Sequence, residues 1–200
     1  MAVAVLPRAD RECASGEDAD HLTRRPPAAT IASYRSRGPR MVTLFLSLLL
    51  AANVLGAPPE FELASPQATT RVLVPASEPE CVVLAAEDLA RDVERITGQR
   101  PAMVRRLEAC GAQAVVLATA ARPGSARLLA RFLPDAGEAL EGKWEAWRVR
   151  TVGAAVGPVR RALVIAGSDV RGTMFGLYTF CEKQLHVDPM HFWADTPPGT

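Results

Sequence analysis

Residues 162–198 read ALVIAGSDVRGTMFGLYTFCEKQLHVDPMHFWADTPP, and this stretch decides the fold. An apolar run over 161–166 predicts a buried strand that ends at a tight polar turn. A helix is expected over 169–185, and an aromatic segment then closes on a Pro-Pro pair. A strand followed directly by a helix predicts a β/α domain rather than an all-β or an all-α one.

The polar turn between this strand and this helix carries Ser168, Asp169 and Arg171. Functional side chains gather at such turns in strand-helix units, so these residues are the first candidates for a site. Gly172 and Gly176 lie one above the other on the same side of the helix. Glycine costs about 0.5–1 kcal/mol relative to alanine inside a helix, so this pair indicates close packing on a neighbouring sheet.

Upstream of this stretch, strands and helices alternate from Arg71 onward. Short apolar runs bounded by turn residues predict strands, and apolar stripes at helical spacing predict helices. The strands are expected at 71–75, 101–105, 114–118 and 144–152, with helices after Ser77 as far as Ile96 and from Pro123 to Leu133. Strand 144–152 should pair with strand 161–166 as a hairpin whose turn spans 153–158.

The first of these helices has clear end signals. Ser77 and Glu80 have the spacing of a capping box, and Gly98 stands where a C-terminal cap belongs. The predicted fold is therefore α/β, of α+β-like character, with a mixed β-sheet. Two or three helices are expected, layered mainly on one face of the sheet.

Composition excludes several classes of function. The formal net charge is +1 and 48% of the residues are hydrophobic, which allows a sizeable core but gives no electrostatic case for nucleic acid. No Cys-x-x-Cys spacing is present, so no zinc site is expected. Cys81 and Cys110 are a candidate disulfide pair in an exported protein, whereas Cys181 is predicted to be a buried free thiol.

The N-terminal 70 residues are predicted to lie outside the domain. Residues 1–40 show no sustained periodicity, which indicates either disorder or a misassigned start, with Met41 as the true initiator. Residues 41–57 resemble a secretory signal, and 58–70 form a leader into the fold. We expect a secreted or periplasmic protein whose only membrane contact is this signal segment. A weaker alternative retains residues 42–57 as a membrane anchor.

The order of elements from Arg71 to Pro198 resembles the N-terminal domain of glycoside hydrolase family 115, whose members are xylan α-1,2-glucuronidases. The specific part of the resemblance is IAGSDVRGTMFG at 165–176 together with Trp-Ala-Asp at 193–195. Related accessory domains precede the catalytic barrels of other glycosidases. The resemblance therefore implies a non-catalytic accessory domain, over 71–198, of a secreted carbohydrate-active hydrolase.

The same resemblance implies where the chemistry of such an enzyme would lie. The catalytic acids of the family sit on a (β/α)8 barrel of about 250 residues. That barrel would begin after Pro198 and is absent from these 200 residues, so no catalytic residue is expected here and the chain alone should be inactive. Phe192 and Trp193 are predicted to pack against the barrel. No metal and no cofactor are implied.

The resemblance also gives the polar turn a role. Ser168, Asp169, Arg171 and Gly172 would stand at the rim of a sugar-acid pocket, because an arginine fork matches a carboxylate. A glucuronoxylan-type polysaccharide is the implied ligand. The alternative is that Ser168 or Asp169 caps the helix while Arg171 pairs locally.

A second class of function remains open, namely a stand-alone exported carbohydrate-binding or interaction module. Its motivation is a set of tryptophans at 144, 147 and 193, which stack on sugar rings in some proteins and pack in cores or between domains in most. His186, Asp188 and His191 lie close in sequence, but a proline between them breaks helical spacing, so they predict no metal site.

Overall fold

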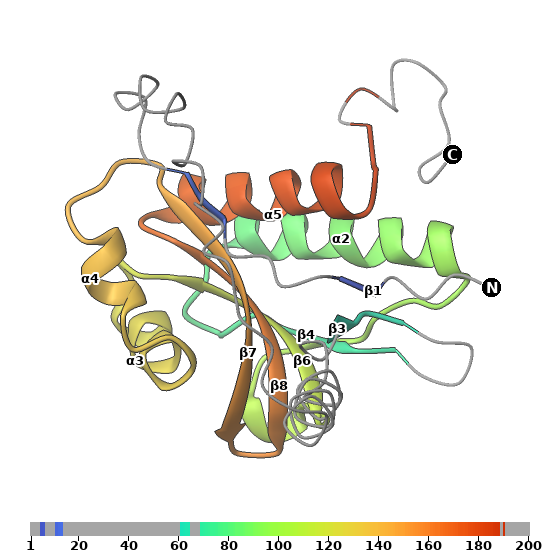
Figure 1. The fold of residues 1–200 in the computed structure, drawn as a ribbon, viewed down its shortest axis with the longest axis horizontal. Coiled ribbons are helices and arrows are strands. Elements are labelled where there is room, and N and C mark those ends of the chain that lie inside the picture. Colours follow the sequence, from blue (N-terminus) through green and yellow to red (C-terminus); the bar gives the residue numbers. More distant parts are fainter. Residues whose placement is uncertain (1–4, 7–10, 14–60, 65–68, 189, 191–200) are drawn as a thin grey trace, which may run out of the picture. The chain divides into compact units, whose positions relative to one another are not determined.

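The structure is a computed structural model that describes residues 5–6, 11–13, 61–64, 69–188 and 190 (Figure 1). Its helices are α2 (Glu80–Thr97), η1 (Leu107–Ala109), α3 (Pro123–Phe132), α4 (Ala136–Leu140) and α5 (Val170–Gln184). Its strands are β1 (Val5–Leu6), β2 (Arg11–Cys13), β3 (Phe61–Glu62), β4 (Arg71–Leu73), β5 (Met103–Val104), β6 (Gln113–Thr119), β7 (Trp147–Val156) and β8 (Val159–Gly167).

The main sheet has six strands in the order β2-β7-β8-β6-β4-β5. Strands β5, β4, β6 and β8 run parallel to one another, whereas β7 is antiparallel to β8 and β2 is antiparallel to β7. The predicted α/β class with a mixed sheet is therefore confirmed. The carboxyl ends of β4, β6 and β8 meet at one edge of the sheet, and the loops at that edge carry the polar residues considered below.

The buried side chains of the central strands alternate between two halves of the core, as the pleat of a strand requires. On β6, Val115 and Leu117 face one half, while Ala114, Val116 and Ala118 face the other. β4 and β8 alternate in the same way. Because both faces are apolar, helices must cover both.

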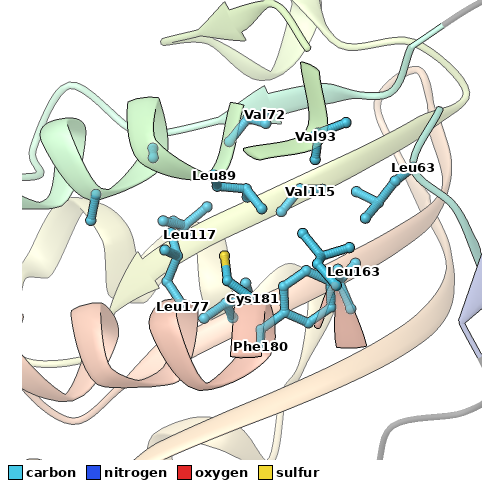
Figure 2. Packing of buried hydrophobic residues seen from close by; sticks show 14 of the residues in the cluster. Leu63, Val72, Leu89, Val93, Val115, Leu117, Leu163, Leu177, Phe180 and Cys181 are labelled. Carbon is cyan, nitrogen blue, oxygen red and sulfur yellow. The ribbon is translucent and has the colours of Figure 1, made fainter. Parts of the chain in front are cut away.

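The two long helices, α2 and α5, cover the first face side by side (Figure 1). Their apolar stripes meet the sheet through residues such as Leu89 of α2 and Leu177 of α5, and both side chains are fully buried (Figure 2). Cys181 lies in the same cluster as a free thiol, as predicted, and burial raises its pKa. Helices α2 and α5 thus form the layer that the sequence predicted on one face of the sheet.

The short helices α3 and α4 cover the opposite face. Leu129, Phe132 and Leu140 pack there against the alanines of β6 and β8. Sequence reasoning placed the helices mainly on one face and did not predict α4. The alternation of apolar residues on both faces of β6 and β8 explains why a second layer forms, since the alanine face also needs cover.

The hairpin of β7 and β8 is confirmed, but its turn is tighter than predicted. β7 continues through Gly153 to Val156 with a register shift, and the turn is reduced to Gly157 and Pro158. Gly157 has φ +60°, a conformation that favours glycine. The edge strand near Pro101 is confirmed as β5, and Gly98 caps α2 with φ +74°.

Two further predictions can be compared with the structure. The described part of residues 1–40 supplies β1, which pairs with β3, and β2, which pairs with β7. No packed element was expected there, but the outer edge of β7 offers unpaired backbone groups that a strand can satisfy. Cys81 and Cys110 are both free, because they belong to the two opposite halves of the core.

Residues 41–57 and most of 58–70 lie outside the described residues. Within the part that the structure describes, no helix is both long enough and apolar enough to cross a membrane.

Candidate functional site

The turn after β8 is built by hydrogen bonds to the segment that leads into β7. The Ser168 N–H donates to the Ala146 carbonyl over 2.8 Å, and the Ala146 N–H donates to Ser168 Oγ over 3.0 Å. The Glu145 N–H donates to Asp169 Oδ2 over 2.8 Å. Ser168 and Asp169 therefore fix the start of β7 beside the end of β8.

Asp169 is also the N-cap of α5. Its Oδ1 accepts a hydrogen bond of 2.8 Å from the Gly172 N–H, and its backbone is extended, as a cap residue requires. The carboxylate thus accepts one backbone N–H on each oxygen. The capping role that sequence reasoning kept as an alternative is the role that the structure displays.

Gly172 and Gly176 allow α5 to approach the sheet closely. A Cβ built on Gly172 would lie 2.3 Å from the Ala146 carbonyl oxygen, a distance that no side chain tolerates. A Cβ on Gly176 would lie 3.0 Å from the Trp147 Cβ and 3.2 Å from Ile165 Cγ2. The predicted close packing of the glycine pair is confirmed, and it accounts for the placement of Gly172.

Arg171 points to a local partner. Its guanidinium forms an ion pair of 3.0 Å with Glu145, and it lies 5.6 Å from the centroid of the Phe175 ring. The side chain is 64% exposed, so this pair contributes little stability. Arg171 therefore makes a local ion pair on the surface, whereas Ser168 and Asp169 face a cavity.

That cavity has a volume of about 510 Å³ and lies where β6 and β8 end. The chain leaves β6 toward α3 and leaves β8 toward α5, on opposite faces of the sheet, and such a crevice is where open α/β sheets bind ligands. Its apolar wall includes Ala120, Ala121, Ala126, Leu129, Ala130 and Leu140. Its polar residues, which we call the pocket rim, are Glu141, Lys143, Ser168 and Asp169.

The pocket rim thus contains two of the four turn residues that the sequence singled out. Arg171 and Gly172 are not among the lining residues, and Lys143 supplies the cation in their place. Sequence reasoning missed Lys143 and Glu141 because the loop before β7 carries no motif. The signal available was indirect: one of the two lysines of the chain stands next to an exposed tryptophan.

A second polar group lies at the same edge of the sheet, and we call it the Glu78 cluster. Glu78 is only 5% exposed, and its carboxylate accepts 2.8 Å hydrogen bonds from the Thr119 N–H and the Thr119 hydroxyl. The Thr119 and Thr173 hydroxyls are also 2.8 Å apart. The cluster ties the loop before α2 to the end of β6 and to the first turn of α5.

The Glu78 cluster corrects the predicted capping box. No side chain caps α2, whose N-cap is Pro79. Ser77 instead shares a 2.8 Å hydrogen bond with Ser125 of α3. The Ser-x-x-Glu spacing failed because α2 begins only after Pro79. Ser77 is therefore left to bond to α3, and Glu78 to bond to the end of β6.

The three candidate tryptophans have different surroundings. Trp147 is half-buried against Gly176, whereas Trp144 is 72% exposed. Trp193, Phe192 and His191 lie outside the described residues, so their packing stays a prediction. Among the residues that the structure describes, no three His, Cys, Asp or Glu side chains come together as metal ligands would.

Comparison with known proteins finds a likeness to solved structures. No family model matches the chain, and no curated protein matches it. The chain is similar to the solved structure of a family GH115 4-O-methyl-α-glucuronidase with specificity for decorated arabinogalactans. The TM-score is 0.49 at 23% sequence identity, over 66% of this chain and 15% of the other. The chain therefore spans a small part of the length of that protein.

Proposed function

We propose that residues 71–198 form the N-terminal, non-catalytic accessory domain of a secreted carbohydrate-active hydrolase of the xylan α-glucuronidase kind. The sequence resemblance over 165–176 and 193–195 supports the assignment. In this role the domain buttresses a catalytic barrel through Phe192 and Trp193 and contributes the edge of the sheet to a sugar-binding surface.

The non-catalytic part of the proposal rests on the hydrogen bonds that the carboxylates at this edge make. Glycoside hydrolysis requires two carboxyl groups about 5–10 Å apart that are free to act on the scissile bond. Glu78 is buried and bonded to Thr119, and Asp169 is bonded to the N–H groups of Glu145 and Gly172. Both carboxylates hold the backbone, which is a structural task, and among the residues that line the cavity only Glu141 offers a further carboxylate.

The proposal is tested by reading the gene beyond codon 200 and by assaying the product. We expect the frame to continue into a (β/α)8 barrel, and the longer chain to release glucuronic acid from glucuronoxylan oligosaccharides while residues 1–200 alone release none. A genuine stop after Thr200 in the native transcript would contradict the proposal.

Mass spectrometry of the exported protein should give a mature N-terminus near Pro58, and an intact residue 1 would contradict export by this segment.

A second candidate function, a stand-alone exported carbohydrate-binding module, is favoured by one observation. Trp144 is exposed beside Lys143, which lines the cavity. Affinity electrophoresis in gels containing glucuronoxylan distinguishes the two functions. Retardation of the 200-residue chain supports the binding module, and migration unchanged from a polysaccharide-free gel counts against it.

A further inference from the structure

We propose that the 510 Å³ cavity at the ends of β6 and β8 binds a zwitterion, namely a free α-amino acid with an apolar side chain. This ligand lies outside the proposed function, and its chemistry follows only from the residues that line the cavity. They supply an ammonium, a carboxylate, a buried hydroxyl and an apolar wall, and each of these has a counterpart in such a ligand.

Two oppositely charged side chains line the cavity without neutralising each other. Glu141 and Lys143 follow α4 directly, and Gly142 between them has φ +69°, which turns the chain sharply. Neither side chain forms an ion pair with any residue that the structure describes. A singly charged ligand would be attracted by one of them and repelled by the other, whereas a zwitterion is attracted by both.

Ser168 and Asp169 supply a second donor and a second acceptor in the same cavity. Ser168 is only 6% exposed, and its Oγ accepts the Ala146 N–H, while its own proton has no acceptor among the described residues. A buried donor without a partner costs free energy, which the ligand carboxylate recovers. Each Asp169 oxygen accepts one backbone N–H and keeps a lone pair, which suits the ligand ammonium.

The apolar part of the wall suits the side chain of the amino acid. Ala126, Leu129 and Ala130 of α3 and Leu140 of α4 line the cavity. The volume of 510 Å³ lies within the range of about 300–1,000 Å³ that is typical of small-ligand pockets, so room remains beside the charged groups. An apolar side chain that leaves water for this wall adds affinity, and leucine should therefore bind more tightly than glycine.

The test is an NMR titration of the isotope-labelled 200-residue chain with L-leucine, glycine, N-acetyl-leucine and leucine amide. N-acetyl-leucine lacks the cation of the zwitterion, and leucine amide lacks its anion. We expect leucine to bind with a dissociation constant on the order of 1 mM, as befits a ligand of this size, and to shift the amide signals of Gly142, Ser168 and Asp169. Each of the two derivatives should bind roughly fivefold more weakly, the size of the effect of a partly exposed ion pair.

Two variants show which side chain meets which end of the ligand. Glu141→Gln should weaken leucine binding roughly fivefold, but it should bind N-acetyl-leucine no more weakly than the wild type does, because that derivative has no ammonium to lose. Lys143→Gln should weaken leucine binding to a similar extent and should bind leucine amide no more weakly, because that derivative has no carboxylate. Glu138→Gln is the matched control, since Glu138 is an exposed carboxylate of α4 that does not line the cavity.

Three outcomes would overturn the inference. They are unmoved signals of the cavity residues on titration with leucine, binding of either derivative as tight as that of leucine, and equal leucine affinity of the wild type and either charge variant. Matching unfolding temperatures of the variants and the wild type exclude a folding defect. None of these outcomes involves a barrel or glucuronoxylan, so each would leave the proposed function standing. A genuine stop after Thr200 would contradict only the proposed function.

Discussion

The Glu78 cluster and the pocket rim lie at the same edge of one sheet, yet their polar groups are used in opposite ways. In the Glu78 cluster, the carboxylate and both threonine hydroxyls are buried and bonded to one another. In the pocket rim, the Lys143 ammonium and the hydroxyl proton of Ser168 have no acceptor among the described residues. Closed networks stabilise a fold, whereas open groups beside a cavity are available to a ligand.

The difference has a cause in the connections that leave the strands. The loops after β4 and β8 turn toward the α2 and α5 layer, and the loop after β6 turns toward α3. Glu78 reaches the end of β6 from the loop after β4 and closes that side, while the space between β6, β8 and α3 stays open as the cavity. Substitutions in the Glu78 cluster should therefore change the stability of the fold, and substitutions in the pocket rim should change ligand binding.

The largest effect is expected from Glu78→Ala, which opens the closed network. The Thr119 N–H and hydroxyl would lose their acceptor in a buried site, and an unsatisfied buried group costs about 1–3 kcal/mol. We expect a total loss of about 3 kcal/mol in the free energy of unfolding measured in urea. Glu87→Ala, an exposed carboxylate on α2, is the control and should change stability by less than about 0.5 kcal/mol. Equal effects from the two substitutions would refute the structural role of Glu78.

Gly172→Ala should have the next largest effect, because it pushes α5 away from the segment that holds the pocket rim. The added Cβ would clash with the Ala146 carbonyl at 2.3 Å, and overpacking of this kind costs about 1–3 kcal/mol. Gly137→Ala in α4 is the control, since a Cβ there meets nothing within 4 Å and alanine favours a helix. Urea unfolding of both variants makes the comparison, and an unchanged Gly172→Ala variant would show that the backbone yields at no cost.

The sequence predicted the sheet better than it predicted the edge of the sheet. Val115 and Leu117 in an unbroken apolar run identify β6 by local pattern alone, and the glycine pair of α5 correctly indicated close packing. These features depend on neighbours in the sequence, so periodicity and residue type suffice to find them.

The candidate site could be predicted only in part, because its residues meet through tertiary contacts. Ser168 and Asp169 were found through their place between a strand and a helix. Glu78 bonds to a residue 41 positions away, and Lys143 reaches the cavity only because α3 and α4 form its wall. No local pattern encodes such distances. The capping-box spacing at Ser77 was misleading because Pro79 shifts the helix start.

Asp169→Ala separates the structural role of the pocket rim from its ligand role. The substitution removes the cap of α5 and the acceptor of the Glu145 N–H, so we expect a loss of about 1 kcal/mol in stability, as for other N-caps. Asp169→Asn should lose less, because its amide oxygen keeps one acceptor. Thermal unfolding of the two variants measures this order. A stable Asp169→Ala variant would mean that the carboxylate serves only a ligand.

The smallest effect is expected at Asp135, beside the wall of the pocket. Its carboxylate lies 2.9 Å from Arg148 and 3.3 Å from Arg150. Burial by itself would raise the pKa of Asp135, but the charge and hydrogen bond of Arg148, aided by Arg150, hold it below its usual 3.8. A depressed pKa stabilises the fold above the unfolded-state pKa, and that contribution disappears as pH falls through the lower folded-state value.

Asp135→Asn should therefore destabilise the protein at neutral pH and flatten the acid limb of its stability profile below about pH 4. Because Asp135 is 54% exposed, solvent screening keeps the effect at neutral pH within about 0.2–1 kcal/mol. Glu138→Gln, an exposed change in the neighbouring α4, should leave the shape of the profile as it is. Unfolding temperatures recorded across the acid range test this, and parallel wild-type and Asp135→Asn curves would mean that apolar packing alone positions the pocket wall.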